Sequence, residues 1–154
     1  MDKKILVTYC GLYCDLCDSR SKMPQRAAAL REVMKKGDYE HWGPSLPDFV
    51  EFWRFLEGLT QVDDKCCRSG KCGAPNCAMR KCAIDKGLFA CPKCDDYPCD
   101  KVLLFAKSEP TLLHDGERFK QIGIEAWIEE QEERKRCGFN YGDVRCCPAE
   151  IPTE

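Results

Sequence analysis

A stretch of 34 residues, from 66 to 99, constrains the fold more than any other part of the sequence. It holds eight cysteines, whereas its large apolar side chains are only Met79, Ile84, Leu88, Phe89 and Tyr97. These side chains bury too little surface to offset the conformational entropy of ordering such a length of chain. Bound metal is a natural substitute, because structural zinc contributes about 10–16 kcal/mol in small peptides. We therefore expect a loop region organised around metal-bound thiolates.

The compartment decides what the 14 cysteines of this 154-residue chain mean. The N-terminal apolar run covers only residues 5–7, which is shorter than the ~7–15 residues of a signal peptide. We therefore expect a cytoplasmic protein, in which clustered cysteines are metal ligands more often than disulfides. No apolar stretch approaches the ~18 residues of a membrane span. The net charge of -2 provides no basic field for nucleic acid.

Two CxxC loops each supply half of a zinc site, because the turn between the cysteines aims two thiolates at one point. One loop runs from Cys14 to Cys17, and the other from Cys91 to Cys94. The predicted four-cysteine sites are Cys82, Cys91, Cys94 and Cys99, and Cys14, Cys17, Cys67 and Cys72. Cys10 and Cys77 are extra or alternative ligands. Closed sites of this kind leave no position for water, so they predict structural metal.

The spacing of the remaining cysteines limits how they pair. Four cysteines recur every five residues: Cys67, Cys72, Cys77 and Cys82. On a helix, five residues rotate the side chain by about 500°, so these cysteines would not share one face. That spacing predicts loops with a short helix between them. Cys66 and Cys67 are adjacent, as are Cys146 and Cys147, and neighbours seldom both reach one tetrahedral centre. We expect one of each pair to be spare and choose Cys67 as the ligand; the role of Cys137 stays open.

Apolar spacing predicts a mostly helical single domain over 1–154. Residues 1–60 hold a short strand at 5–9, a helix from Ser19 or Ser21 to about Lys36, and a helix in PDFVEFWRFLEGL. The last of these is apolar on nearly all sides and is expected at the centre of the core. Residues 61–100 form the cysteine-rich metal-binding region, with a short helix in CAMRKCAID. Residues 101–154 hold helices in KVLLFAK and GIEAWIEEQEERKR, then an irregular tail. The Trp127 face of the second of these helices is expected to dock on the core.

Three cysteine-rich segments together carry a resemblance to a known family. They are YCGLYCDLC near the start, CAMRKCAIDKGLFACPKCDDYPC, and GIEAWIEEQEERKRC. The chain resembles a small cysteine-rich bacterial and archaeal family catalogued only as a domain of unknown function, number 3795. The resemblance implies a presumed zinc-binding protein and carries no established activity, so it assigns no catalytic residues.

The cysteine spacing is also compatible with functions other than zinc binding. The triplet Cys10-x3-Cys14-x2-Cys17 has the spacing of radical S-adenosylmethionine enzymes, but the chain lacks the recurring βα units of their barrel. That reading is a remote alternative. A thiol-redox role for Cys91 and Cys94 lacks its βαβ context. An iron-sulfur cluster stays open, because four thiolates suit zinc and clusters alike.

The function expected from the sequence is that of a metal-binding protein and not, on balance, an enzyme. Its zinc sites would support a binding surface, and the partner such a surface suits is another protein; the oligomeric state stays open. The alternative is an iron-sulfur protein acting in electron transfer or redox sensing. The basic residues around the cysteines are expected to offset thiolate charge rather than to bind nucleic acid. They are Lys65, Arg68, Lys71, Arg80, Lys81 and Lys86.

Overall fold

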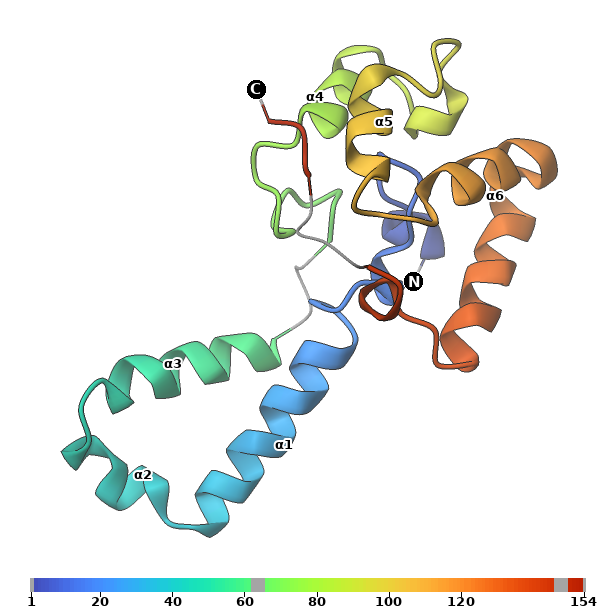
Figure 1. Ribbon diagram of the computed structural model, residues 1–154. Helices are drawn as coiled ribbons and strands as arrows, with labels where there is room; N and C mark the ends of the chain where they lie inside the picture. The colour runs from blue at the N-terminus through green and yellow to red at the C-terminus, as the bar shows by residue number, and fades with distance from the viewer. Residues whose placement is uncertain (1, 62–65, 146–149, 154) are drawn as a thin grey trace.

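Helices make up most of the computed structural model, which describes residues 2–61, 66–145 and 150–153 (Figure 1). The helices are α1 (Lys22–Lys36), α2 (Tyr39–Trp42), α3 (Phe49–Thr60), α4 (Ala78–Asp85), α5 (Asp100–Ala106) and α6 (Leu112–Arg136). The mostly helical class predicted from the sequence is confirmed. β-Structure in the described part of the chain is restricted to isolated bridges, between Val7 and Tyr13 and between Cys77 and Thr153.

The helices α1, α2 and α3 form an arm that projects from the rest of the molecule (Figure 1). α1 begins after Ser21 and ends before Gly37, as its sequence predicts. α3 runs back along α1, and Arg31 joins the two helices. Its guanidinium donates to Glu57 at 2.7 Å and lies 5.5 Å from the centre of the Trp53 ring.

The expectation that α3 forms the centre of the core is wrong. Phe49 and Leu56 are buried, but Val50, Phe52 and Phe55 are exposed, and Phe55 retains 66% of its accessible surface. The physical reason is the position of the helix, since among the described residues the main packing partners of α3 lie within the arm. One neighbouring helix covers only one side of a helix that is apolar on nearly all sides.

The core lies instead around Trp127 of α6, which is fully buried. Tyr13 and Phe119 meet the Trp127 ring edge-on, with ring centres 6.0 Å and 5.5 Å away. The indole Nε1 donates to the Asp115 carbonyl at 3.0 Å, so the one polar atom of this ring is satisfied. The predicted docking of the Trp127 face on the core is confirmed.

α6 bends sharply at Gly123, whose φ of 79° breaks the helix into two halves. The halves fold back toward each other, and an ion pair between Arg118 and Glu130 joins them across the bend. A second pair joins Arg134 to the buried Asp115 at 2.9 Å. The bend allows α6 to cover the N-terminal segment and the two CxxC loops from one side (Figure 1).

The short N-terminal strand expected at residues 5–9 is replaced by a 3-10 helix, η1 (Lys3–Leu6). The Asp2 side chain caps it by accepting from the Lys4 backbone N–H at 3.0 Å. Beyond η1 the chain pairs with itself through Val7 and Tyr13, so a tight loop containing Cys10 replaces an extended strand. A local cap and a local turn therefore outweigh the β-propensity of the segment.

Candidate functional site

The two CxxC loops have the same backbone conformation. The first forms the 3-10 turn η2 (Cys14–Leu16), and the second forms η4 (Cys91–Lys93). In each, the N–H of the second cysteine donates to the carbonyl of the first, at 3.0 Å in one loop and 2.8 Å in the other. Turns of this kind place both thiols of a loop on one side, as the sequence predicts for metal ligands.

The two loops are docked against each other. The N–H of Cys91 donates to the Tyr9 carbonyl at 2.6 Å. Gly11 has a φ of 98°, and a Cβ added to it would lie 2.8 Å from Cγ of Pro92. The glycine that follows Cys10 is therefore required both by its own backbone and by the close approach of the second loop.

The predicted set of Cys82, Cys91, Cys94 and Cys99 is brought into one neighbourhood. Cys91 is buried, Cys82 lies on α4, and Cys99 caps α5. Burial raises the pKa of the Cys91 thiol to about 12, and the nearby thiols of Cys99 and Cys82 act in the same direction. Lys86 lies 3.5 Å from the Cys94 sulfur and offers it a positive charge.

Tyr97 anchors the end of this set to α6. Its hydroxyl contacts the Leu112 carbonyl at 3.4 Å, and its ring lies directly on Gly116, where an added Cβ would overlap the hydroxyl. The YPC sequence that ends in Cys99 therefore takes its place from packing against α6.

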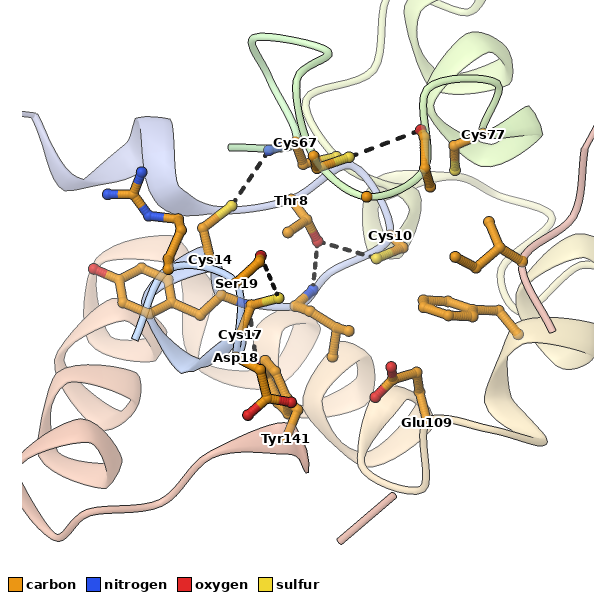
Figure 2. A pocket seen from close by; sticks show the side chains of 18 of the residues that line it. Thr8, Cys10, Cys14, Cys17, Asp18, Ser19, Cys67, Cys77, Glu109 and Tyr141 are labelled. Atoms are coloured by element: carbon orange, nitrogen blue, oxygen red, sulfur yellow. Dashed lines mark hydrogen bonds between the residues drawn. The ribbon is translucent and has the colours of Figure 1, made fainter. Parts of the chain in front are cut away.

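Six further predicted ligands line a single cavity of about 360 Å³ (Figure 2). They are Cys10, Cys14, Cys17, Cys67, Cys72 and Cys77. Most of the other lining is apolar, and it includes Leu12, Met79 and Phe105. Glu109 also lines the cavity and is almost fully buried.

Cys14 lies at one side of this cavity. The backbone N–H of Cys67 points at its sulfur from 3.4 Å. Burial raises the pKa of the Cys14 thiol to about 12, and the thiols of Cys66 and Cys17 add to that rise. Cys66 is itself buried, and its sulfur accepts from the Ser69 N–H at 3.3 Å. Backbone N–H groups aimed at sulfur stabilise the thiolate, which is the form that binds metal.

Cys72 lies among different partners. The Cys67 thiol forms a hydrogen bond with Cys72, which lowers the pKa of Cys72 and raises that of Cys67. Arg80 donates to the Cys72 sulfur at 3.3 Å and to the Ala74 carbonyl at 3.0 Å. This buried guanidinium therefore orders the loop and places a positive charge beside a thiolate.

Other basic residues of the region lie partly at the thiols and partly on aromatic rings. Arg68 is held between the rings of Tyr9 and Phe89, at 4.6 Å and 3.9 Å from their centres. Lys86 pairs with Asp96 at 2.8 Å as well as approaching Cys94. The contacts of Arg80 and Lys86 agree with the expectation that these charges offset thiolates. Lys65 lies outside the described residues.

The remaining cysteines differ in their surroundings. Cys66, the member of the adjacent pair that is not expected to be a ligand, lies beside Cys14, and only its burial and its neighbours reveal this. Cys137 is exposed and donates to Glu133 at 3.4 Å. Cys146 and Cys147 lie outside the described residues. Every cysteine within the described part of the chain is a free thiol.

The donor set fits zinc or an iron-sulfur cluster by its chemistry, because soft thiolates dominate both neighbourhoods. The thiols are not drawn tightly together: within residues 2–61, 66–145 and 150–153, no three potential ligands converge closely enough to hold an ion. Metal binding at either neighbourhood would therefore require the cysteine side chains to rotate inward.

Comparison with known proteins yields one match. A family model described as "Protein of unknown function (DUF3795)" matches residues 6–103, which is well over half of the chain and includes both CxxC loops. No curated protein and no solved structure matches. Among the described helices, none is both long enough and apolar enough to span a membrane.

Proposed function

The chain belongs to the DUF3795 family of proteins of unknown function, and we propose that it is a metal-binding protein whose cysteines hold structural zinc. The observation that carries this proposal is the neighbourhood of Cys91. A buried thiol lies among those of Cys82, Cys94 and Cys99, which come from a helix, a CxxC loop and a helix cap. Four uncharged thiols would contribute little to the stability of the fold where these segments meet. Four thiolates, in contrast, match the ligand set of structural zinc.

A second zinc site in the cavity completes the proposal. The CxxC loop of Cys14 and Cys17 faces the segment that carries Cys67 and Cys72. A metal ion there would hold the N-terminal loop onto the cysteine-rich segment, which has few apolar side chains of its own. Cys10 and Cys77 line the same cavity and are further candidate ligands. A reducing compartment such as the cytosol would keep these thiols available.

The surface that the zinc sites would support is the arm of α1, α2 and α3. Val50, Phe52 and Phe55 are exposed along α3, and Leu30 and Val33 are exposed along α1. Exposed apolar side chains gathered on one projecting element are typical of a surface that binds another protein. In this proposal the metal centres act as a scaffold, and no chemical step is assigned to them.

An iron-sulfur cluster is the second candidate, and the cavity is the observation that favours it. About 360 Å³ lined by Cys10, Cys14, Cys17, Cys67, Cys72 and Cys77 offers more room and more thiols than one zinc ion uses. A cluster held there would act in electron transfer or redox sensing.

Metal analysis of protein purified without oxygen and without added metal tests both candidates. Zinc bound in stoichiometric amount to a colourless protein supports the first candidate. Iron and sulfide with visible absorbance support the second. The matched control is Cys137→Ser, which removes an exposed thiol outside both neighbourhoods and should leave the metal content unchanged. A folded protein that holds neither zinc nor iron, even after anaerobic reconstitution, would contradict both.

A further inference from the structure

The adjacent residues Cys66 and Cys67 direct their thiols to different partners. Cys66 lies beside Cys14, whose pKa its charge would raise. The Cys67 thiol bonds to Cys72 and also lies near Cys10. Cys67 approaches the Cys14 sulfur with its backbone N–H and not with its thiol (Figure 2). The peptide between the two residues therefore separates two sets of thiols.

Cys10 and Cys77 belong with Cys67 on the far side of this peptide. Figure 2 shows Cys77 and Cys10 together on the opposite side of the cavity from Cys14, and the charge of Cys77 acts on Cys10. Cys10 is buried and forms a 3.0 Å hydrogen bond with the Thr8 hydroxyl. Three chain segments thus contribute thiols to one place: the N-terminal loop, the loop after Cys66, and the start of α4.

The set around Cys10 lies next to the neighbourhood of Cys91, because the charge of Cys91 acts on Cys10 and the charge of Cys77 acts on Cys91. Cys77 caps α4 and Cys82 lies within it, five residues later. Five residues rotate a side chain by about 500°, which leaves the two thiols about 140° apart around the helix axis. Cys77 and Cys82 therefore point to different sides of α4, so the two adjacent sets draw on different cysteines of this helix.

The charge of the set around Cys10 is partly balanced by the protein itself. Arg80 is buried and lies 3.3 Å from the Cys72 sulfur, and the charges of Cys67 and Cys77 also act on it. Four thiolates around a divalent ion leave a net charge of about -2, which is costly to bury without a counter-charge. A fixed guanidinium at this position offsets part of that charge.

We propose that Cys66 and Cys67 serve two different metal centres, one on each side of the peptide that joins them. Cys10, Cys67, Cys72 and Cys77 bind one, with Arg80 as its counter-charge. Cys14, Cys17 and Cys66 contribute to the other. With the set around Cys91, the chain then binds about three zinc ions. The inference rests on the proposed function and divides its second site between two centres, so that Cys67 and Cys72 do not share an ion with Cys14 and Cys17. Neither residue of the adjacent pair is then spare.

Paired substitutions measure whether the two cysteines share an ion. Zinc per chain is determined by mass spectrometry on the folded wild type and on each variant. The double variant Cys67→Ser/Cys72→Ser removes two ligands of one proposed centre and should lose one ion. The double variant Cys66→Ser/Cys67→Ser removes one ligand from each of two centres and should weaken or lose two. Cys137→Ser should match the wild type.

Alkylation of the wild type provides a readout that does not depend on any variant folding. Zinc is withdrawn in steps by a chelator, and the thiols freed at each step are alkylated and identified by mass spectrometry. Cys66 should become reactive together with Cys14 and Cys17. Cys67 should become reactive together with Cys10, Cys72 and Cys77.

The outcomes separate this inference from the proposed function. If the wild type binds about two ions and Cys66 is alkylated in the fully loaded protein, the additional centre is wrong while the zinc protein stands. If Cys66 and Cys67 become reactive in the same step, they share one site, and the inference is also wrong. A wild type with no metal removes the proposed function itself.

Discussion

Gly11 and Glu109 show how single residues carry the candidate site. Gly11 lies where the two CxxC loops dock, and the loop of Cys10 depends on its left-handed backbone. Glu109 lies at the wall of the cavity, where Arg145 pairs with one carboxylate oxygen. The other oxygen is buried without a hydrogen-bond partner among the described residues. The surroundings of both residues are formed by parts of the chain that are distant in sequence.

Gly11→Ala should lower the free energy of unfolding of the metal-loaded protein by about 1–3 kcal/mol. The reason is that alanine disfavours a φ of 98° and its Cβ would lie 2.8 Å from Pro92. Gly58→Ala is the matched control, because an added Cβ in the helix α3 meets no atom of the described residues within 4 Å. This change should raise stability by about 0.5–1 kcal/mol. Urea unfolding measures both, and equal effects of the two changes would contradict the prediction.

Glu109 should make stability depend on pH in a defined direction. Burial raises the pKa of Glu109 above its ordinary 4.5, and Arg145 opposes that rise without cancelling it. The folded state therefore binds the proton more tightly than the unfolded state does. Stability relative to Glu109→Gln should fall as the pH rises from 4.5 through the raised pKa. Urea unfolding of the two proteins across that range measures the stability of the wild type relative to the variant. An increase of this relative stability with pH would refute the prediction.

At the scale of elements, α3 does not take the role that its sequence suggests, whereas α6 does. α3 has the stronger apolar pattern, yet Phe55 and Val50 face solvent, because the main partners of α3 among the described residues lie within the arm. α6 carries many charges, yet its bend at Gly123 wraps Trp127 into the core. An apolar pattern predicts that a helix needs cover, but not which partner supplies it.

Neighbouring substitutions in α3 should have opposite consequences. Leu56→Ala should cost about 2–5 kcal/mol, because Leu56 is 3% exposed and packs within the arm. Phe55→Glu should change stability by less than about 0.5 kcal/mol, because that side chain faces solvent. Thermal unfolding followed by circular dichroism measures both. A large loss of stability in Phe55→Glu would mean that the exposed face of α3 is covered within the protein.

At the scale of the whole molecule, the contacts that stabilise the fold differ between the body around Trp127, the cysteine-rich segment and the arm. The body around Trp127 is held by buried apolar and aromatic side chains. In the segment from 66 to 99, Arg80 contacts the Cys72 sulfur and Arg68 lies on the Tyr9 ring, and in the proposed function metal bound to the cysteines supplies the rest. The arm is held by contacts between its own helices.

Removing metal should therefore affect these regions unequally. A chelator should increase amide hydrogen exchange in residues 66–99 and in the first CxxC loop, because the thiolates there lose their shared ion. The second half of α6 should change least, since Trp127 and Ile128 remain buried by apolar contacts. Hydrogen exchange with mass spectrometry measures this, with the undisturbed zinc-loaded protein as reference. Unchanged exchange in 66–99 after verified metal loss would show that metal does not order this region.

The sequence by itself determined the helical class, the approximate positions of α1, α3, α4, α5 and the second half of α6, and the two CxxC turns. These are local properties, set by apolar spacing, capping residues and turn chemistry over a few residues. Only the tertiary structure decided that α3 projects while Trp127 is central, and that Cys66 faces Cys14 while Cys67 faces Cys72. Burial and thiol neighbourhoods depend on contacts between segments far apart in the chain, and residue spacing does not encode those contacts.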